Sequence, residues 1–201
     1  MLNHGTSSVV QGWFMEFVGA VIRQLPRDIN PTTADGWINN QDALKKALRE
    51  VLSPNEKPVV NAYSAVVDYG KSVEEMVKLG RYDWSSNNIT SEHFPTKRIG
   101  KTEIVVDLVH FNRRIGTDEA LKELDRMGYR PAELYELLAF GEKYPEIQRG
   151  FPVIALGSVW RSSGGNRYVP CLGGSGFRRY LDLHWIEGGW GGLYRFAAVR
   201  K

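Results

Sequence analysis

The feature that most constrains the fold is the way glycine divides residues 151–201. Glycine clusters recur at 164–165, 173–176 and 188–192, and the segments between them are short and rich in β-branched, aromatic and leucine side chains. Such segments between glycine turns are typical of strands and are too short for stable helices. The pattern predicts an antiparallel meander of four strands, at residues 153–160, 167–172, 179–186 and 194–199.

The third of these strands separates its side chains into two faces, because successive residues of a strand point to opposite sides. Its apolar side chains share one face: Leu181, Leu183 and Trp185. Its polar side chains share the other: Tyr180, Asp182 and His184. The apolar face is predicted to pack, and the polar face, with Arg178, Arg179 and Tyr194 nearby, has the composition of a recognition surface. An ordinary solvated sheet face is the competing interpretation.

The pattern of residues 1–111 predicts two helices followed by a strand, a third helix and a second strand. Apolar residues at helical spacing predict a core helix at 11–24, a loop at 28–37 and a second helix at 40–52 that Asn40 caps and that Ser53 and Pro54 end. Strands are expected at 59–69 and at 103–111, the latter buried on both faces. Between them, Ser72 and Glu75 form a capping box that opens a helix ending at Gly80, and residues 83–100 read as a polar loop.

Two more helices are expected before residue 150. Thr117 and Asp118 cap the first, Gly128 ends it, and Pro131 lies in the first turn of the second, so the pair should form a helical hairpin. From residue 151 glutamine and methionine disappear. We therefore expect an α+β protein in which an N-terminal helical and α/β portion, residues 1–150, packs on a C-terminal Gly/Trp-rich antiparallel β module, residues 151–201.

Composition excludes several functions. A single cysteine, Cys171, cannot form an internal disulfide, which favours a reducing cytoplasm. No run approaches the roughly twenty apolar residues that cross a bilayer, so no membrane partner is expected. The net charge of +3, with basic and acidic residues interleaved, argues against nucleic acid. No metal and no cofactor are predicted, because the histidines lack ligand spacing and no glycine cluster has a phosphate-binding motif.

Two alternative functions remain at this stage. An enzyme of unrecognised type would use His184, Asp182 or Cys171, although no motif supports a nucleophile and a lone cysteine usually fills a core. A nucleic-acid-binding accessory protein would use arginines against phosphate: Arg113, Arg114, Arg161, Arg178 and Arg179. The sequence favours neither, so we expect a binding protein that is not an enzyme and whose partner is an unknown protein or small ligand.

Three tryptophans could either stack a ligand or fill the core. We expect Trp160 and Trp185 to be buried. Trp190 has a glycine on each side, and the sequence leaves its position open.

The C-terminal segment resembles the variable proteins of diversity-generating retroelements. The residues that carry the resemblance are Gly157-Ser158-Val159-Trp160, then Arg167, then the glycine and tryptophan turns, and finally residues 194–200 with their Arg195-Phe196 pair. The resemblance covers about residues 151–201. The whole chain also looks like uncharacterised proteins of candidate-phyla bacteria.

This resemblance implies a C-type-lectin-like fold and a binding function. In that family a reverse transcriptase rewrites adenine-containing codons, so that a β framework displays varied residues to a target. By resemblance the framework would include Leu181, Leu183, Trp185, Trp190, Arg195 and Phe196. The ligand-binding positions would be Gly173, Gly174, Ser175, Phe177, Tyr180, Asp182, His184, Gly189, Gly191 and Tyr194.

Overall fold

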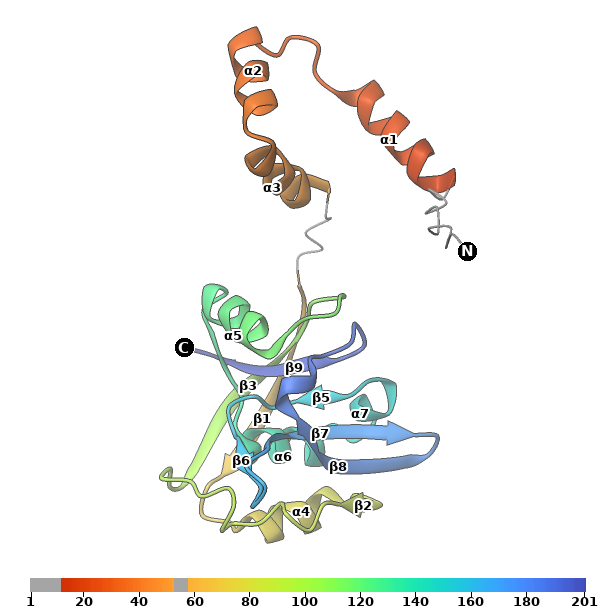
Figure 1. Cartoon of the computed structure of the whole chain (residues 1–201). Coiled ribbons are helices and arrows are strands. Elements are labelled where there is room, and N and C mark those ends of the chain that lie inside the picture. Colours follow the sequence, from red (N-terminus) through yellow and green to blue (C-terminus); the bar gives the residue numbers. More distant parts are fainter. Residues whose placement is uncertain (1–11, 53–57) are drawn as a thin grey trace, which may run out of the picture. The chain divides into compact units, whose positions relative to one another are not determined.

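The computed structural model describes residues 12–52 and 58–201 of the chain (Figure 1). The chain divides into two compact units, Met1–Asn55 (unit 1) and Glu56–Lys201 (unit 2). The expected boundary at residues 150 and 151 is not where this division falls, because strands from both sides of residue 150 belong to one sheet.

The described part of unit 1 is helical, with α1 at Gly12–Gln24, α2 at Pro31–Asn39 and α3 at Gln41–Leu52. The prediction of α3 is confirmed, and the Asn40 side chain accepts a hydrogen bond from the Ala43 N–H at 3.1 Å. The prediction of a loop at 28–37 is wrong. The Asn30 side chain caps α2 by accepting from the Thr32 N–H at 2.9 Å, and Pro31 lies in the first turn, where its missing N–H has no intrahelical partner to lose.

Helix α1 forms as predicted, but it is not a core helix. Phe14 is 45% exposed and Ile22 is 62% exposed. The spacing of apolar residues decides which face of a helix they share, but not whether another element covers that face. The expected helix start at Gln11 and the expected stops at Ser53 and Pro54 lie outside the described residues.

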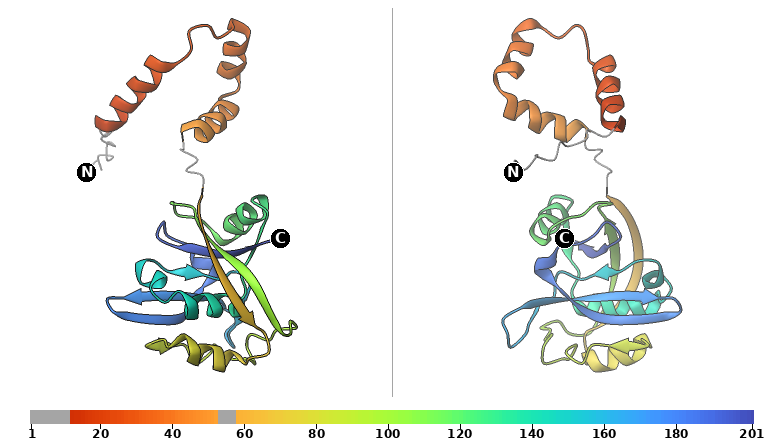
Figure 2. Two further views of the ribbon diagram at one scale, coloured as in Figure 1. Left: turned by 180° about the vertical axis from the view of Figure 1, so that it is seen from behind. Right: turned by 45° about the vertical axis from the view of Figure 1, so that its right-hand side comes forward.

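Unit 2 is built on one mixed sheet, in which residues 58–201 contribute nine strands in the order β1-β3-β9-β5-β7-β8-β2, with β4 added beside β9 and β6 beside β7 (Figures 1 and 2). The α+β class is thereby confirmed. The strands are β1 (Val59–Asp68), β2 (Trp84–Ser85), β3 (Lys101–His110), β4 (Tyr129–Pro131), β5 (Val153–Ile154), β6 (Trp160–Arg161), β7 (Arg167–Ser175), β8 (Arg178–Trp185) and β9 (Arg195–Arg200).

The two strands expected before residue 111 are present as β1 and β3, which pair antiparallel along their whole length. The second half of β3 is buried on both faces, as predicted, because Leu108 belongs to the cluster that packs against α6 and Val109 belongs to the cluster on the opposite face. Strand β2 falls in the segment expected to be a polar loop, and it pairs in parallel with β8.

The C-terminal strands do not form the predicted meander. β7 and β8 do make an antiparallel hairpin, from Tyr168 opposite Trp185 to Ser175 opposite Arg178. β9, however, lies between β3 and β5 and runs parallel to β5. The segment between β8 and β9 contains a short helix, η1 (Ile186–Gly188), and an isolated bridge from Trp190 to Ile115, so it carries the chain across the sheet instead of turning back tightly.

Four α-helices accompany the sheet in the described part of unit 2: α4 (Val73–Gly80), α5 (Thr117–Arg126), α6 (Leu134–Lys143) and α7 (Ile147–Gly150). The capping box of Ser72 and Glu75 at α4 is confirmed. Gly128 has a φ of 82°, as expected for a residue that ends a helix in the left-handed region.

The predicted helical hairpin is wrong, because β4 separates α5 from α6. Pro131 is the last residue of β4, and Glu133 caps α6. Thr117 is also not the cap of α5. Gly116 occupies that position, and the Thr117 hydroxyl donates to the Ile186 carbonyl instead.

The two faces of the sheet bury separate clusters. On one face, side chains such as Leu108 and Leu172 pack against α6, which is buried from Leu134 to Gly141, and α4 packs on α6. On the other face, Phe196 and its neighbours pack against α5. Helix α5 lies near β4 and β9, so it does not extend over the β7–β8 hairpin (Figure 1).

Candidate functional site

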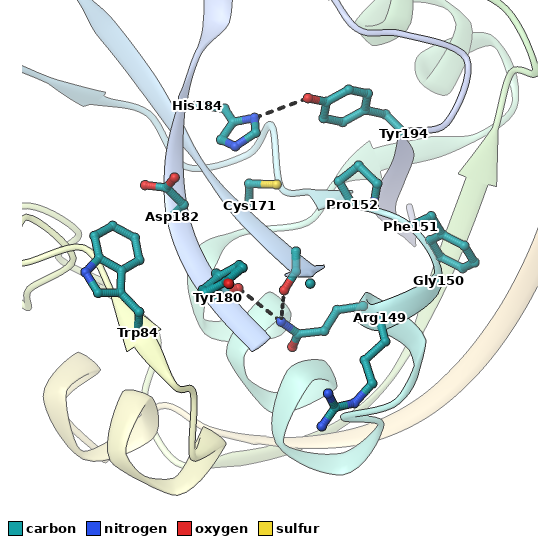
Figure 3. A pocket seen from close by; sticks show the side chains of 13 residues that line it. Trp84, Arg149, Gly150, Phe151, Pro152, Cys171, Tyr180, Asp182, His184 and Tyr194 are labelled. Carbon is teal, nitrogen blue, oxygen red and sulfur yellow. Dashed lines mark hydrogen bonds between the residues drawn. The ribbon is translucent and has the colours of Figure 1, made fainter. Parts of the chain in front are cut away.

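A pocket of about 530 Å³ lies against one face of the β7–β8 hairpin (Figure 3). Its walls come from the β7–β8 hairpin, from α7 with the loop that follows it, from β2, and from the residue before β9. They are Trp84, Gln148, Arg149, Gly150, Phe151, Pro152, Cys171, Gly173, Gly174, Tyr180, Asp182, His184 and Tyr194.

Strand geometry explains why these side chains meet. Tyr180, Asp182 and His184 alternate along β8 and therefore point to one side. Across the hairpin, Asp182 lies opposite Cys171, and Tyr180 lies opposite Gly173. A Cβ atom on Gly173 would meet no atom within 4 Å, so the absence of a side chain there leaves open space beside Tyr180.

A buried amide holds α7 against this hairpin. The Gln148 side-chain N–H₂ donates to the carbonyls of Gly173 at 2.7 Å and Tyr180 at 3.0 Å. Its oxygen accepts from Arg179 at 3.0 Å. The two strands and the helix are thus joined at one end of the pocket.

Arg179 does not belong to the presented face, contrary to expectation. Its guanidinium is buried and donates to the carbonyls of Gly80 and Gly141, both at 2.7 Å. It lies over the Tyr82 ring, 4.9 Å from the centroid. Because its guanidinium is buried and its two terminal nitrogens donate inside the protein, Arg179 is not available to contact phosphate.

Burial controls the titratable groups of the pocket. It lowers the pKa of His184, and the nearby Asp182 carboxylate opposes that effect only in part. The Tyr194 hydroxyl lies 3.5 Å from His184 Nδ1. Burial raises the pKa of the Cys171 thiol, and the Asp182 charge raises it further. At neutral pH the pocket therefore contains a neutral imidazole and a protonated thiol.

The structure brings six of the ten predicted site residues into the pocket: Gly173, Gly174, Tyr180, Asp182, His184 and Tyr194. Ser175 and Phe177 lie at the end of the hairpin outside the lining, and Phe177 is 95% exposed. Gly189 and Gly191 flank Trp190 and are also outside it.

Residues missed by sequence reasoning complete the pocket, chiefly Trp84, Gln148, Arg149 and Phe151. The one usable signal is Trp84, a large aromatic residue in a mostly polar segment. Gln148 and Arg149 carry no motif, because their role depends on contacts with a hairpin more than twenty residues away.

The tryptophans differ from expectation. Trp185 was predicted to pack but is 52% exposed, since it ends β8 at the margin of the sheet. Trp190 is 1% exposed and donates its indole N–H to the Thr117 hydroxyl at 3.0 Å. Trp160 is partly buried and lies against the rings of Tyr168 and His93.

Within residues 12–52 and 58–201, no three side chains of the types that ligate metals gather closely enough to hold an ion. None of the helices in this part of the chain has the length and apolarity needed to span a bilayer.

No family model, curated protein or solved structure matches this chain. The structure itself defines an α+β protein with a large mixed sheet, and the β7–β8 pocket is its candidate site.

Proposed function

We propose that this chain is a binding protein whose site is the β7–β8 pocket, and that it binds its ligand without transforming it. The observation that carries the proposal is the convergence of Tyr180, Asp182, His184 and Tyr194 on one cavity. A volume of about 530 Å³ suits a small molecule. The lining supplies aromatic surface together with a few polar groups, which is the usual composition of a ligand site.

An enzyme that uses Cys171, Asp182 or His184 is the second candidate, because all three line the pocket. Two observations favour binding. Cys171 is 1% exposed and its pKa is raised by burial, which opposes formation of a nucleophilic thiolate. Asp182 Oδ1 accepts from the Leu183 N–H at 2.7 Å, and no hydrogen bond joins this carboxylate to the His184 ring in the described structure.

The resemblance to retroelement variable proteins adds a finer proposal, in which the scaffold is C-type-lectin-like and the pocket residues vary between copies. The DNA beside the gene tests it. A near-copy of the segment that encodes residues 160–201, differing where the copy has adenines and lying near a reverse-transcriptase gene, would support diversification. An ordinary locus would remove this part of the proposal and leave the pocket as a fixed site.

Ligand-observed NMR with the full chain and a fragment library tests the binding function. The informative variant is Gly173→Val, because its side chain would enter the open space beside Tyr180. Gly116→Val is the matched control, since Gly116 is exposed, has open space around its Cβ position and lies outside the pocket.

We expect a set of fragments that bind the wild-type protein and Gly116→Val but not Gly173→Val. Circular dichroism of both variants should match the wild type, which shows that loss of binding is not loss of folding. If no fragment binds in a way that Gly173→Val abolishes, the pocket is not a small-molecule site.

A further inference from the structure

We propose that the pocket recognises a ligand that joins a cationic amine to an aromatic or other planar group. This inference rests on the proposed binding function. It assigns the amine to Asp182, and the planar group to the surface formed by Trp84 and Tyr180.

The first argument is the state of the Asp182 carboxylate. Its hydrogen bond comes from a neutral donor, the Leu183 N–H, and within the described part of the chain no Lys, Arg or His nitrogen lies within 4.0 Å of it. Its neighbour across the hairpin is the uncharged thiol of Cys171. A partly buried carboxylate without a cation has lost hydration without receiving an ion pair, and a cationic ligand would supply that pair.

The second argument is that no other charged group in the pocket competes with a ligand amine for the Asp182 carboxylate. Among the lining residues, Arg149 is the one that carries a fixed positive charge. Its Nε lies 3.0 Å from the Glu146 carboxylate, and its guanidinium also donates to the Phe177 carbonyl. Figure 3 shows Arg149 on α7, away from Asp182. His184 is neutral at pH 7, because burial lowers its pKa.

The third argument is the aromatic surface next to the carboxylate. Trp84 and Tyr180 are direct partners on the parallel strands β2 and β8, so their side chains lie on the same side. Asp182 follows two residues after Tyr180 on that side. Trp84 remains half-exposed, which leaves ring surface free for a ligand. Aromatic faces stack planar groups and attract cations, and both effects favour an arylalkylamine, which is protonated at pH 7.

A matched set of three probes tests the inference: phenethylamine, its neutral analogue 2-phenylethanol and its anionic analogue 3-phenylpropionate. Dissociation constants are measured by NMR at pH 7 for the full chain and for two variants. Asp182→Asn removes the charge with little change in shape. Asp118→Asn makes the same change at an exposed position on α5, outside the pocket.

We expect phenethylamine to bind at least about tenfold more tightly than 2-phenylethanol, because its ammonium group forms a charge-assisted hydrogen bond. The anionic probe, 3-phenylpropionate, should bind weakest. Asp182→Asn should remove the preference for the amine, and Asp118→Asn should keep it. Adding salt should weaken the binding of phenethylamine more than the binding of 2-phenylethanol.

Equal binding of amine and alcohol, or an amine preference that survives Asp182→Asn, would overturn the inference. The inference would also be overturned if every fragment whose binding Gly173→Val abolishes were neutral or anionic. The pocket would then still be a binding site. The proposed function itself fails only if no fragment is sensitive to Gly173→Val, so the two failures are distinguishable.

Discussion

Two adjacent glycines at the end of β7 should respond in opposite ways to the same substitution. A Cβ on Gly174 would lie 2.9 Å from Arg149 Cα, 3.0 Å from the Gln148 carbonyl oxygen and 3.2 Å from the Arg178 carbonyl oxygen. All three are backbone atoms, so α7 or the strand must move to admit a methyl group. A Cβ on Gly173 would meet nothing within 4 Å.

The magnitudes follow from these surroundings. Forcing an extra carbon into a packed site costs about 1–3 kcal/mol. Moving α7 also strains the hydrogen bonds from Gln148 to the hairpin, worth about 1 kcal/mol each. Gly174→Ala should therefore lower the free energy of unfolding by about 2–4 kcal/mol. Gly173→Ala should leave it unchanged or raise it by about 0.5–1 kcal/mol, because alanine restricts the unfolded chain.

Urea unfolding measures the difference. Near-UV circular dichroism follows the tertiary packing of the buried aromatic residues, among them Trp190. With a slope of about 1–3 kcal/mol per molar urea, the midpoint of Gly174→Ala should fall by about 1–2 M or more. Equal midpoints for the two variants, or a Gly173→Ala variant as unstable as Gly174→Ala, would refute the close packing of α7 on this hairpin.

Three further predictions concern two tryptophans and two hydrogen-bonded carboxylates. Trp190→Ala should lower the free energy of unfolding by about 3–5 kcal/mol, because Trp190 is buried. Trp185→Ala should lower it by less than about 1 kcal/mol, because Trp185 is half-exposed, and urea unfolding measures both changes. Glu136→Gln should cost about 1.5–3 kcal/mol in the same assay, because the hydrogen bond to Arg130, whose Nη2 lies 2.6 Å from the carboxylate, loses its charged acceptor. Hydrogen bonds from Ser91 lower the pKa of Glu74 from 4.5 to about 2, so its stabilisation is present above pH 4.5 and disappears toward pH 2. Ser91→Ala should raise that pKa toward 4.5 in an NMR titration, and an unchanged pKa would contradict the assignment.

Sequence reasoning succeeded where the cause is local. The capping box at Ser72, the Asn40 cap and the left-handed Gly128 depend on atoms a few residues apart, so the local pattern contains most of the information. The alternation along β8 likewise predicted that Tyr180 and Asp182 point to one side.

It failed where the cause is a distant partner. Nothing near β9 shows that it inserts between β3 and β5, and that insertion is what places β1 and β3 in the same sheet as the C-terminal strands. Pro131 fits a first helical turn equally well, but pairing with Ala198 makes it part of β4. Gln148 and Trp84 reach the pocket only through the approach of α7 and β2 to the hairpin.

The central position of β9 has a consequence for biosynthesis. During translation β1 and β3 leave the ribosome long before residues 195–200, which form β9. The pairing of β1 with β3 does not require β9. Until β9 arrives, the free edge of β3 presents unpaired backbone groups beside valine and leucine side chains, which is the kind of edge that recruits other chains. The nascent protein is therefore most prone to aggregation between the synthesis of β3 and that of β9, and a helper that shields this edge would raise the yield of folded protein.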